Sequence, residues 1–87
     1  MIKFVKDQYD HYTVYDNRIE IGYMACSNYY SAKNRKFRQW HFRIDYGKGE
    51  TYDGCAFGCI ANAKKEFITF YIDTIPKHLE WIKALSE

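Results

Sequence analysis

Hydrophobic and polar residues alternate most regularly in the segment 37–46. Successive side chains of a β-strand point to opposite faces of its sheet, so this alternation predicts a strand with one buried and one solvent-facing side. The predicted buried face holds Trp40, Phe42, Ile44 and Tyr46. The predicted solvent face holds Gln39, His41, Arg43 and Asp45.

A second alternating region predicts a β-hairpin. Residues 12–15 and 19–23 both alternate, and Asp16 and Asn17 between them tolerate the left-handed backbone of a tight turn. The segment 2–5 predicts a further short strand at the edge of the sheet.

The rest of the predicted sheet is less regular. Residues 51–57 predict a weaker strand, in which Gly54 favours a bulge. The segment 26–36 has no periodicity and is rich in Ser and Asn, so we expect a long connecting loop there.

From Ile60 onward the hydrophobic period changes to that of a helix. Asn62 is the predicted N-cap, and Pro76 is expected to end this helix and to begin a second one. The inner face of the first helix holds Ile60, Ala63, Phe67, Phe70 and Tyr71. The inner face of the second holds Leu79, Ile82 and Leu85.

Strands followed by helices predict an α+β fold. We expect an antiparallel β-meander of three to five strands, followed by one longer and one short C-terminal helix packed on one face. The length of 87 residues predicts a single domain, 1–87. The chain contains nine tyrosines, six phenylalanines and two tryptophans, which is more than one small core needs. Some tyrosines should therefore be exposed as contact residues.

Charge is segregated along the chain, although the net charge is only +2. Residues 21–44 contain five basic and no acidic side chains, interleaved with aromatic ones. Cations attract phosphates and aromatic faces stack on unpaired bases, while Arg and Tyr also dominate protein interfaces. The predicted partner-binding residues are Tyr29, Tyr30, Lys33, Arg35, Lys36, Arg38 and Arg43.

No constellation of residues indicates catalysis or a cofactor. Cys26, Cys55 and Cys59, together with the histidines, lack the paired short spacing of a structural zinc site, so we expect no metal. Whether the cysteines do more than pack stays open. The N-terminal residues have no long apolar run, which predicts neither a signal peptide nor a membrane span and places the protein in the cytoplasm.

In format the chain resembles small phage-encoded proteins that bind and disable host machinery, anti-CRISPR proteins among them. The resemblance rests on the short chain, the Tyr-rich segment 12–23, the basic segment and the lack of catalytic motifs. These proteins share no motif, so no site residue is carried over. Many of them are acidic mimics of nucleic acid; this mildly basic chain departs from that pattern, and the resemblance implies blocking by contact in the cytoplasm of a host cell.

The sequence therefore predicts a small non-enzymatic binding protein that inhibits or adapts a larger protein or ribonucleoprotein, with a phage anti-defence inhibitor as the class that the resemblance implies. The alternative is binding of RNA or single-stranded DNA through the segment 29–43.

Overall fold

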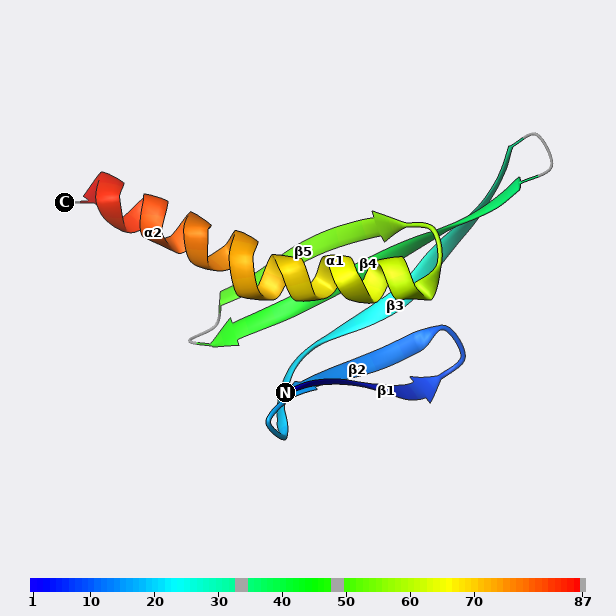
Figure 1. The fold of residues 1–87 in the computed structure, drawn as a ribbon, viewed down its shortest axis with the longest axis horizontal. Helices are drawn as coiled ribbons and strands as arrows, with labels where there is room; N and C mark the ends of the chain where they lie inside the picture. The colour runs from blue at the N-terminus through cyan, green and yellow to red at the C-terminus, as the bar shows by residue number, and fades with distance from the viewer. Residues whose placement is uncertain (33–34, 48–49, 87) are drawn as a thin grey trace.

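The computed structural model describes residues 1–32, 35–47 and 50–86. Five antiparallel strands form one sheet, in which each strand pairs with the next along the chain. This meander confirms the predicted α+β class (Figure 1). The strands are β1 (Ile2–Gln8), β2 (His11–Asp16), β3 (Ile19–Ala32), β4 (Arg35–Gly47) and β5 (Glu50–Phe57).

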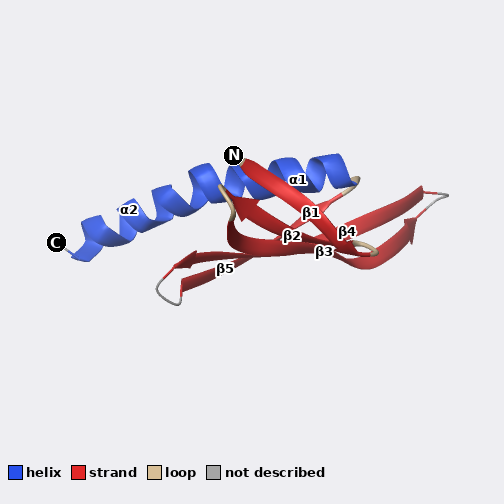
Figure 2. Cartoon of the chain, turned by 90° about the horizontal axis from the view of Figure 1, so that it is seen from below, coloured by secondary structure: helices blue, strands red, loops and turns tan. Residues whose placement is uncertain are grey.

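The chain after the sheet is helical from Ile60 to Ser86. It comprises α1 (Ile60–Thr69), the π-helical turn η1 (Phe70–Thr74) and α2 (Ile75–Ser86). The helix lies on one face of the sheet, and residues 1–32, 35–47 and 50–86 place no helix on the other face (Figure 2). No helix in the described part of the chain combines the length and the apolarity that a membrane span requires.

The alternating segment packs as predicted. Trp40 and Ile44 are fully buried, and Phe42 is 2% exposed. The ring of Phe42 lies 5.4 Å from that of Phe67 and 5.6 Å from that of Phe70, in edge-to-face geometry. Aromatic rings prefer this arrangement, which aligns a positive edge with a negative face. The predicted buried face of this strand therefore packs against the predicted inner face of the first helix.

The turn between β2 and β3 lies one residue later than predicted. Asn17 and Arg18 form it, with φ of 50° and 73°, while Asp16 pairs with Ile19. Two successive left-handed residues match the right-handed twist of the flanking strands, which is why such turns join hairpins.

Two local predictions are wrong. Gly54 makes no bulge but pairs with Phe42, where an added Cβ would meet the Phe42 ring at 2.5 Å. Close packing of that ring, rather than a kink, thus explains the glycine. The N-cap is Cys59 and not Asn62. Asn62 lies in the first turn of the helix, and its side-chain amide donates a hydrogen bond of 2.7 Å to the carbonyl of Phe57, which precedes the helix.

The sequence predicted that the first helix ends at Pro76, and this prediction is wrong. The proline ring excludes a regular α-helical hydrogen bond to the carbonyl four residues earlier. The turn before it is widened, so that the Ile75 amide donates to the carbonyl of Phe70, five residues back. A π-turn of this kind lets the chain continue as a helix past the proline.

The predicted inner face of the second helix is only partly correct. Leu79 packs against the core, but Ile82 is 42% exposed and Leu85 is 66% exposed. A continuous helix of this length outruns the sheet, because each residue adds about 1.5 Å. The end of α2 consequently projects beyond the strands (Figure 1).

Candidate partner-binding surfaces

The central strands of the sheet extend well past their neighbours. The last residue of β3 that pairs with β2 is Ala25, and the first residue of β4 that pairs with β5 is Gln39. Beyond these points the described backbones of β3 and β4 pair with each other, over Asn28–Ala32 and Arg35–Arg38. We call this two-stranded extension the ribbon. It projects from one end of the sheet (Figure 1).

The prediction of a long connecting loop over 26–36 is therefore wrong. β3 continues to Ala32 and β4 begins at Arg35, with an irregularity in register between Cys26 and Asn28. Two strands that pair only with each other are held by backbone hydrogen bonds, which every residue except proline can donate. Ser and Asn therefore do not prevent the pairing.

Most of the predicted binding residues lie on the ribbon. The register pairs Tyr29 with Arg38 and Tyr30 with Phe37, and it places Arg35 and Lys36 on the opposing strand. Lys33 lies outside the described residues. Arg43 is not part of the ribbon, because it pairs with Tyr23 inside the sheet.

Both predicted cations with described side chains have carboxylate neighbours. The Arg38 guanidinium lies 3.6 Å from Asp10 and stacks over the Trp40 ring at 5.9 Å. Arg43 Nε donates to Asp53 Oδ1 at 2.8 Å. That hydrogen bond lowers the pKa of Asp53 and raises the pKa of Arg43. These two positive charges are thus already partly compensated within the molecule.

A row of polar side chains crosses the helix-free face of the sheet. His11 lies 2.6 Å from Asp7, and its ring stacks on that of Tyr23 with centroids 5.4 Å apart. The ring of Tyr23 also approaches His41 at 6.3 Å, and His41 lies 3.7 Å from Asp53. The five residues come from the five different strands, so only the register brings them together.

One end of this row is anchored by hydrogen bonds. The Thr13 hydroxyl donates to Asp7 at 2.6 Å, and this bond, followed by the contact with His11, lowers the pKa of Asp7. Sequence reasoning placed His41 and Arg43 on the solvent face but did not find their neighbours. The alternation of residues gives the face of a strand, whereas only the register gives the partner.

The projecting end of α2 carries a third surface. Trp81 is 60% exposed and Leu85 is 66% exposed, and Ile82 lies beside them in the sequence at 42%. The Trp81 ring contacts His78, whose ring in turn contacts Tyr52 on β5, with centroids 6.2 Å apart in each pair. Large exposed apolar side chains grouped on one helix are typical of protein contact sites.

The cysteines do not form a cluster of metal ligands. Within the described residues, no group of three or more His, Cys, Asp or Glu side chains is arranged to hold an ion. Cys55 and Cys59 are exposed and Cys26 is half-buried, and none of the three forms a disulfide.

Comparison of the chain with protein-family models, with curated proteins and with solved structures finds no match.

Proposed function

We propose that this chain is a non-enzymatic binding protein that docks on a larger protein or ribonucleoprotein through the ribbon. The observation that supports this most is the extension of β3 and β4 beyond the sheet, over the segment that holds most of the predicted binding residues. A two-stranded hairpin without a core is marginal in water. A partner that covers the ribbon stabilises it, and Tyr and Arg are the residue types that contribute most to such interfaces.

The compensated charges favour a protein partner over a nucleic acid. Arg38 and Arg43 each have a carboxylate within 4 Å, which reduces their contribution to phosphate binding. A protein surface can accommodate such ion pairs at the rim of an interface. The exposed apolar residues of α2 favour the same class of partner. Their apolar surface can be buried against a protein, whereas a charged phosphate backbone has no apolar surface to bury it.

The second candidate function is binding of RNA or single-stranded DNA. It is favoured by Tyr23, whose ring lies between those of His11 and His41 on the helix-free face. Phe57, at 56% exposed, lies on the same face by strand alternation. Aromatic rings on an open sheet can stack on unpaired bases, and a basic ribbon at the end of the sheet would guide the nucleic-acid backbone.

A triple variant in the segment 33–36, called the ribbon variant below, separates the two functions. Lys33→Gln, Arg35→Gln and Lys36→Gln remove three charges but leave Arg38, which packs on Trp40. The control removes three charges elsewhere, from the exposed residues Lys3, Lys65 and Lys83. Both variants and the wild type are used as bait in cell lysate, with and without nuclease.

For a protein partner, we expect nuclease-insensitive capture of the same protein by the wild type and the control, and much weaker capture by the ribbon variant. Tyr29→Ala and Tyr30→Ala should weaken it comparably, because aromatic anchors carry much interface energy. Capture that disappears with nuclease would instead support the second function. In that case binding of purified RNA should lose about one unit of salt slope per lost phosphate contact. Inhibition of a defence system of a host cell stays a prediction.

A further inference from the structure

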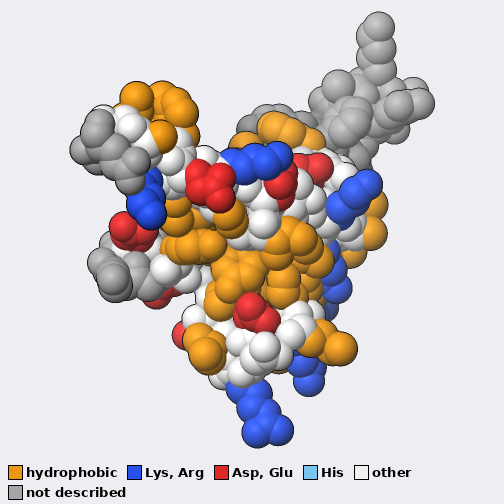
Figure 3. Space-filling model, turned by 60° about the vertical axis from the view of Figure 1, so that its left-hand side comes forward, with side chains coloured by type: hydrophobic (Ala, Val, Ile, Leu, Met, Phe, Trp, Pro, Cys, Tyr) orange, Lys and Arg blue, Asp and Glu red, His pale blue; other side chains and the backbone are white. Residues whose placement is uncertain are grey.

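A hollow of about 490 Å³ lies at the other end of the sheet from the ribbon. The start of β3, the end of β4 and η1 surround it. It is lined by Ile19, Glu20, Ile21, Asp45, Tyr46 and Tyr71. In Figure 3, which turns this side of the molecule forward, hydrophobic side chains gather near the centre of the view with carboxylates beside them.

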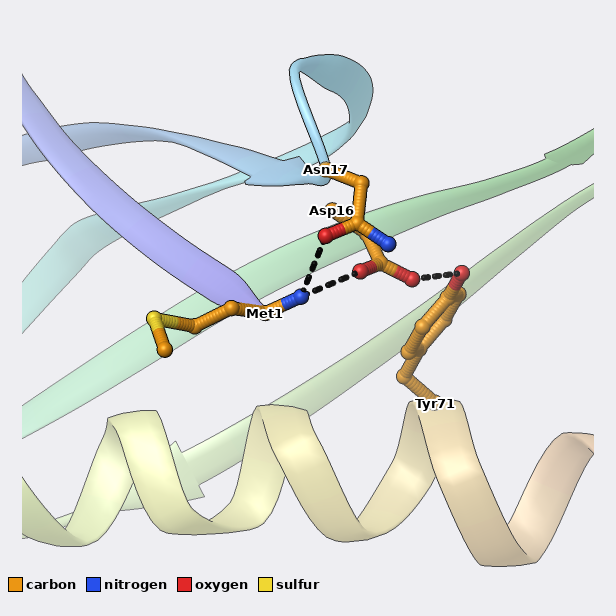
Figure 4. A network of polar contacts seen from close by, with 4 residues as sticks. All are labelled: Met1, Asp16, Asn17 and Tyr71. Carbon is orange, nitrogen blue, oxygen red and sulfur yellow. Dashed lines mark hydrogen bonds and ion pairs between the residues drawn. The ribbon is translucent and has the colours of Figure 1, made fainter.

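Two tyrosine rings form a corner of the hollow. The centroids of Tyr46 and Tyr71 are 5.8 Å apart, and the ring planes meet at 63°. The Tyr71 hydroxyl donates to Asp16 at 3.2 Å, and the amino group of Met1 contacts the same carboxylate (Figure 4). Burial, and then the contact with Asp16, raise the pKa of Tyr71, so its phenol stays protonated and keeps donating. The hydrogen bond holds the ring in place before any ligand arrives.

The remaining walls combine apolar surface with negative charge. Ile21 is 5% exposed, and Ile19 offers a methyl-rich wall at 68% exposed. Glu20 and Asp45 are exposed carboxylates, and no Lys or Arg is among the described residues that line the hollow. Side chains alternate along a strand, so these two carboxylates border the hollow from the face opposite to Ile21 and Tyr46. Their negative charge nearby disfavours an anion as the ligand.

We propose that this hollow binds an organic cation, either a quaternary ammonium group or the cationic end of a basic side chain. The negative faces of aromatic rings attract such cations, and rings set at an angle can contact one cation from two sides. The isoleucines contact its methyl or methylene groups, while Glu20 and Asp45 supply the opposite charge. The site shares no residue with the ribbon, so the proposal is independent of the proposed function.

Choline, its neutral isostere with carbon in place of nitrogen, and N-acetylarginine amide are suitable probes for NMR titration of the labelled protein. We expect choline or the arginine derivative to shift the signals of Ile19, Ile21 and Tyr46 in a saturable way. The neutral isostere should bind at least about fivefold more weakly, the ratio that about 1 kcal/mol of cation–π attraction gives. Tighter binding of choline identifies a quaternary ammonium as the ligand class, and tighter binding of the arginine derivative identifies a basic side chain.

Two variants test the site itself. Glu20→Gln changes an exposed side chain and should weaken binding of the cation several-fold, whereas Glu66→Gln on the exposed side of α1 should not. Tyr46→Leu should weaken it by about fivefold or more; because Tyr46 also packs on the core, its folding is checked separately. The proposal would be overturned if neither choline nor the arginine derivative bound more tightly than the neutral isostere, if no probe gave saturable shifts, or if Glu20→Gln left the affinity of the cation unchanged.

Discussion

Replacing Trp40 by alanine perturbs the point at which the sheet, the base of the ribbon and the start of α1 meet. Trp40 is fully buried and pairs with Cys26 on β3 and Ala56 on β5. Its indole N–H donates to the carbonyl of Gly58 at 3.1 Å, just before the helix begins. One side chain therefore contributes both packing and a long-range hydrogen bond to the fold.

The expected loss is large for a protein of this size. Truncation of a buried tryptophan costs about 3–5 kcal/mol, because both the transfer energy and the packing of the cavity are lost. A chain of 87 residues has a total stability of about 4–13 kcal/mol at typical values per residue. Trp40→Phe keeps a ring in place but leaves the Gly58 carbonyl without the indole donor, so it should cost about 1–3 kcal/mol.

Urea melts followed by far-UV circular dichroism measure both losses. With a slope of about 1–3 kcal/mol per molar urea, Trp40→Phe should lower the midpoint by about 1 M. Trp81→Ala is the matched control: Trp81 is 60% exposed, and its loss should stay near 0.5 kcal/mol. If Trp40→Ala unfolds completely, Trp40→Phe still decides the question. A Trp40→Ala loss below about 1 kcal/mol, or one equal to that of the control, would refute this account of the core.

Three further predictions concern other parts of the fold. Gly54→Ala should destabilise the protein by about 1–3 kcal/mol in urea melts, because its Cβ would overlap the buried Phe42 ring, while the exposed Cys55→Ala next to it should be near neutral. Since the Thr13 hydroxyl lowers the pKa of Asp7, this carboxylate stabilises the fold above about pH 4 and loses that contribution as the pH falls through its folded-state pKa. Thr13→Val should raise the Asp7 pKa in an NMR titration, and an unchanged titration would contradict the contact. Elemental analysis should find no stoichiometric zinc, because the cysteines and histidines lack ligand spacing, and one zinc per chain would reverse that reading.

Sequence periodicity located the core because burial imposes it. One face of β4 packs on the helix, and the other face carries no helix. For this reason the buried residues alternate with polar ones, as Trp40, Phe42 and Ile44 do. The same signal is missing over the ribbon, which extends past the neighbouring strands, and this is why the segment looked like a loop. There the strands are paired by their backbones, and backbone pairing leaves no pattern of hydrophobicity in the sequence.

The C-terminal helix shows a second limit of local patterns. A proline normally marks a helix end, but Pro76 is accommodated by one wide turn, which no periodicity reveals. The pattern also indicated a buried face for Ile82 and Leu85, although the sheet does not reach them. Hydrophobic periodicity reports that a face is apolar and does not report what covers it.

Neither the polar row on the helix-free face nor the aromatic hollow was predicted from the sequence. Asp7, His11, Tyr23, His41 and Asp53 are spread over much of the chain, and each looks like an ordinary surface residue on its own strand. Their meeting depends on four strand registers at once. A shift of one residue in any of them would send part of the row to the other face.

The two proposed binding surfaces lie at opposite ends of the sheet, in a molecule whose longest extent is 52 Å. β3 and β4 run between them, so the same two strands hold the ribbon at one end and Ile19, Tyr46 and the rest of the hollow at the other. The charged residues at the two surfaces also differ in sign, since Arg35, Lys36 and Arg38 belong to the ribbon while Glu20 and Asp45 line the hollow. Exposed charges this far apart are well screened at physiological salt, since the Debye length is about 8 Å. Substitutions at one end should therefore act on that end alone, and each surface can be tested without disturbing the other.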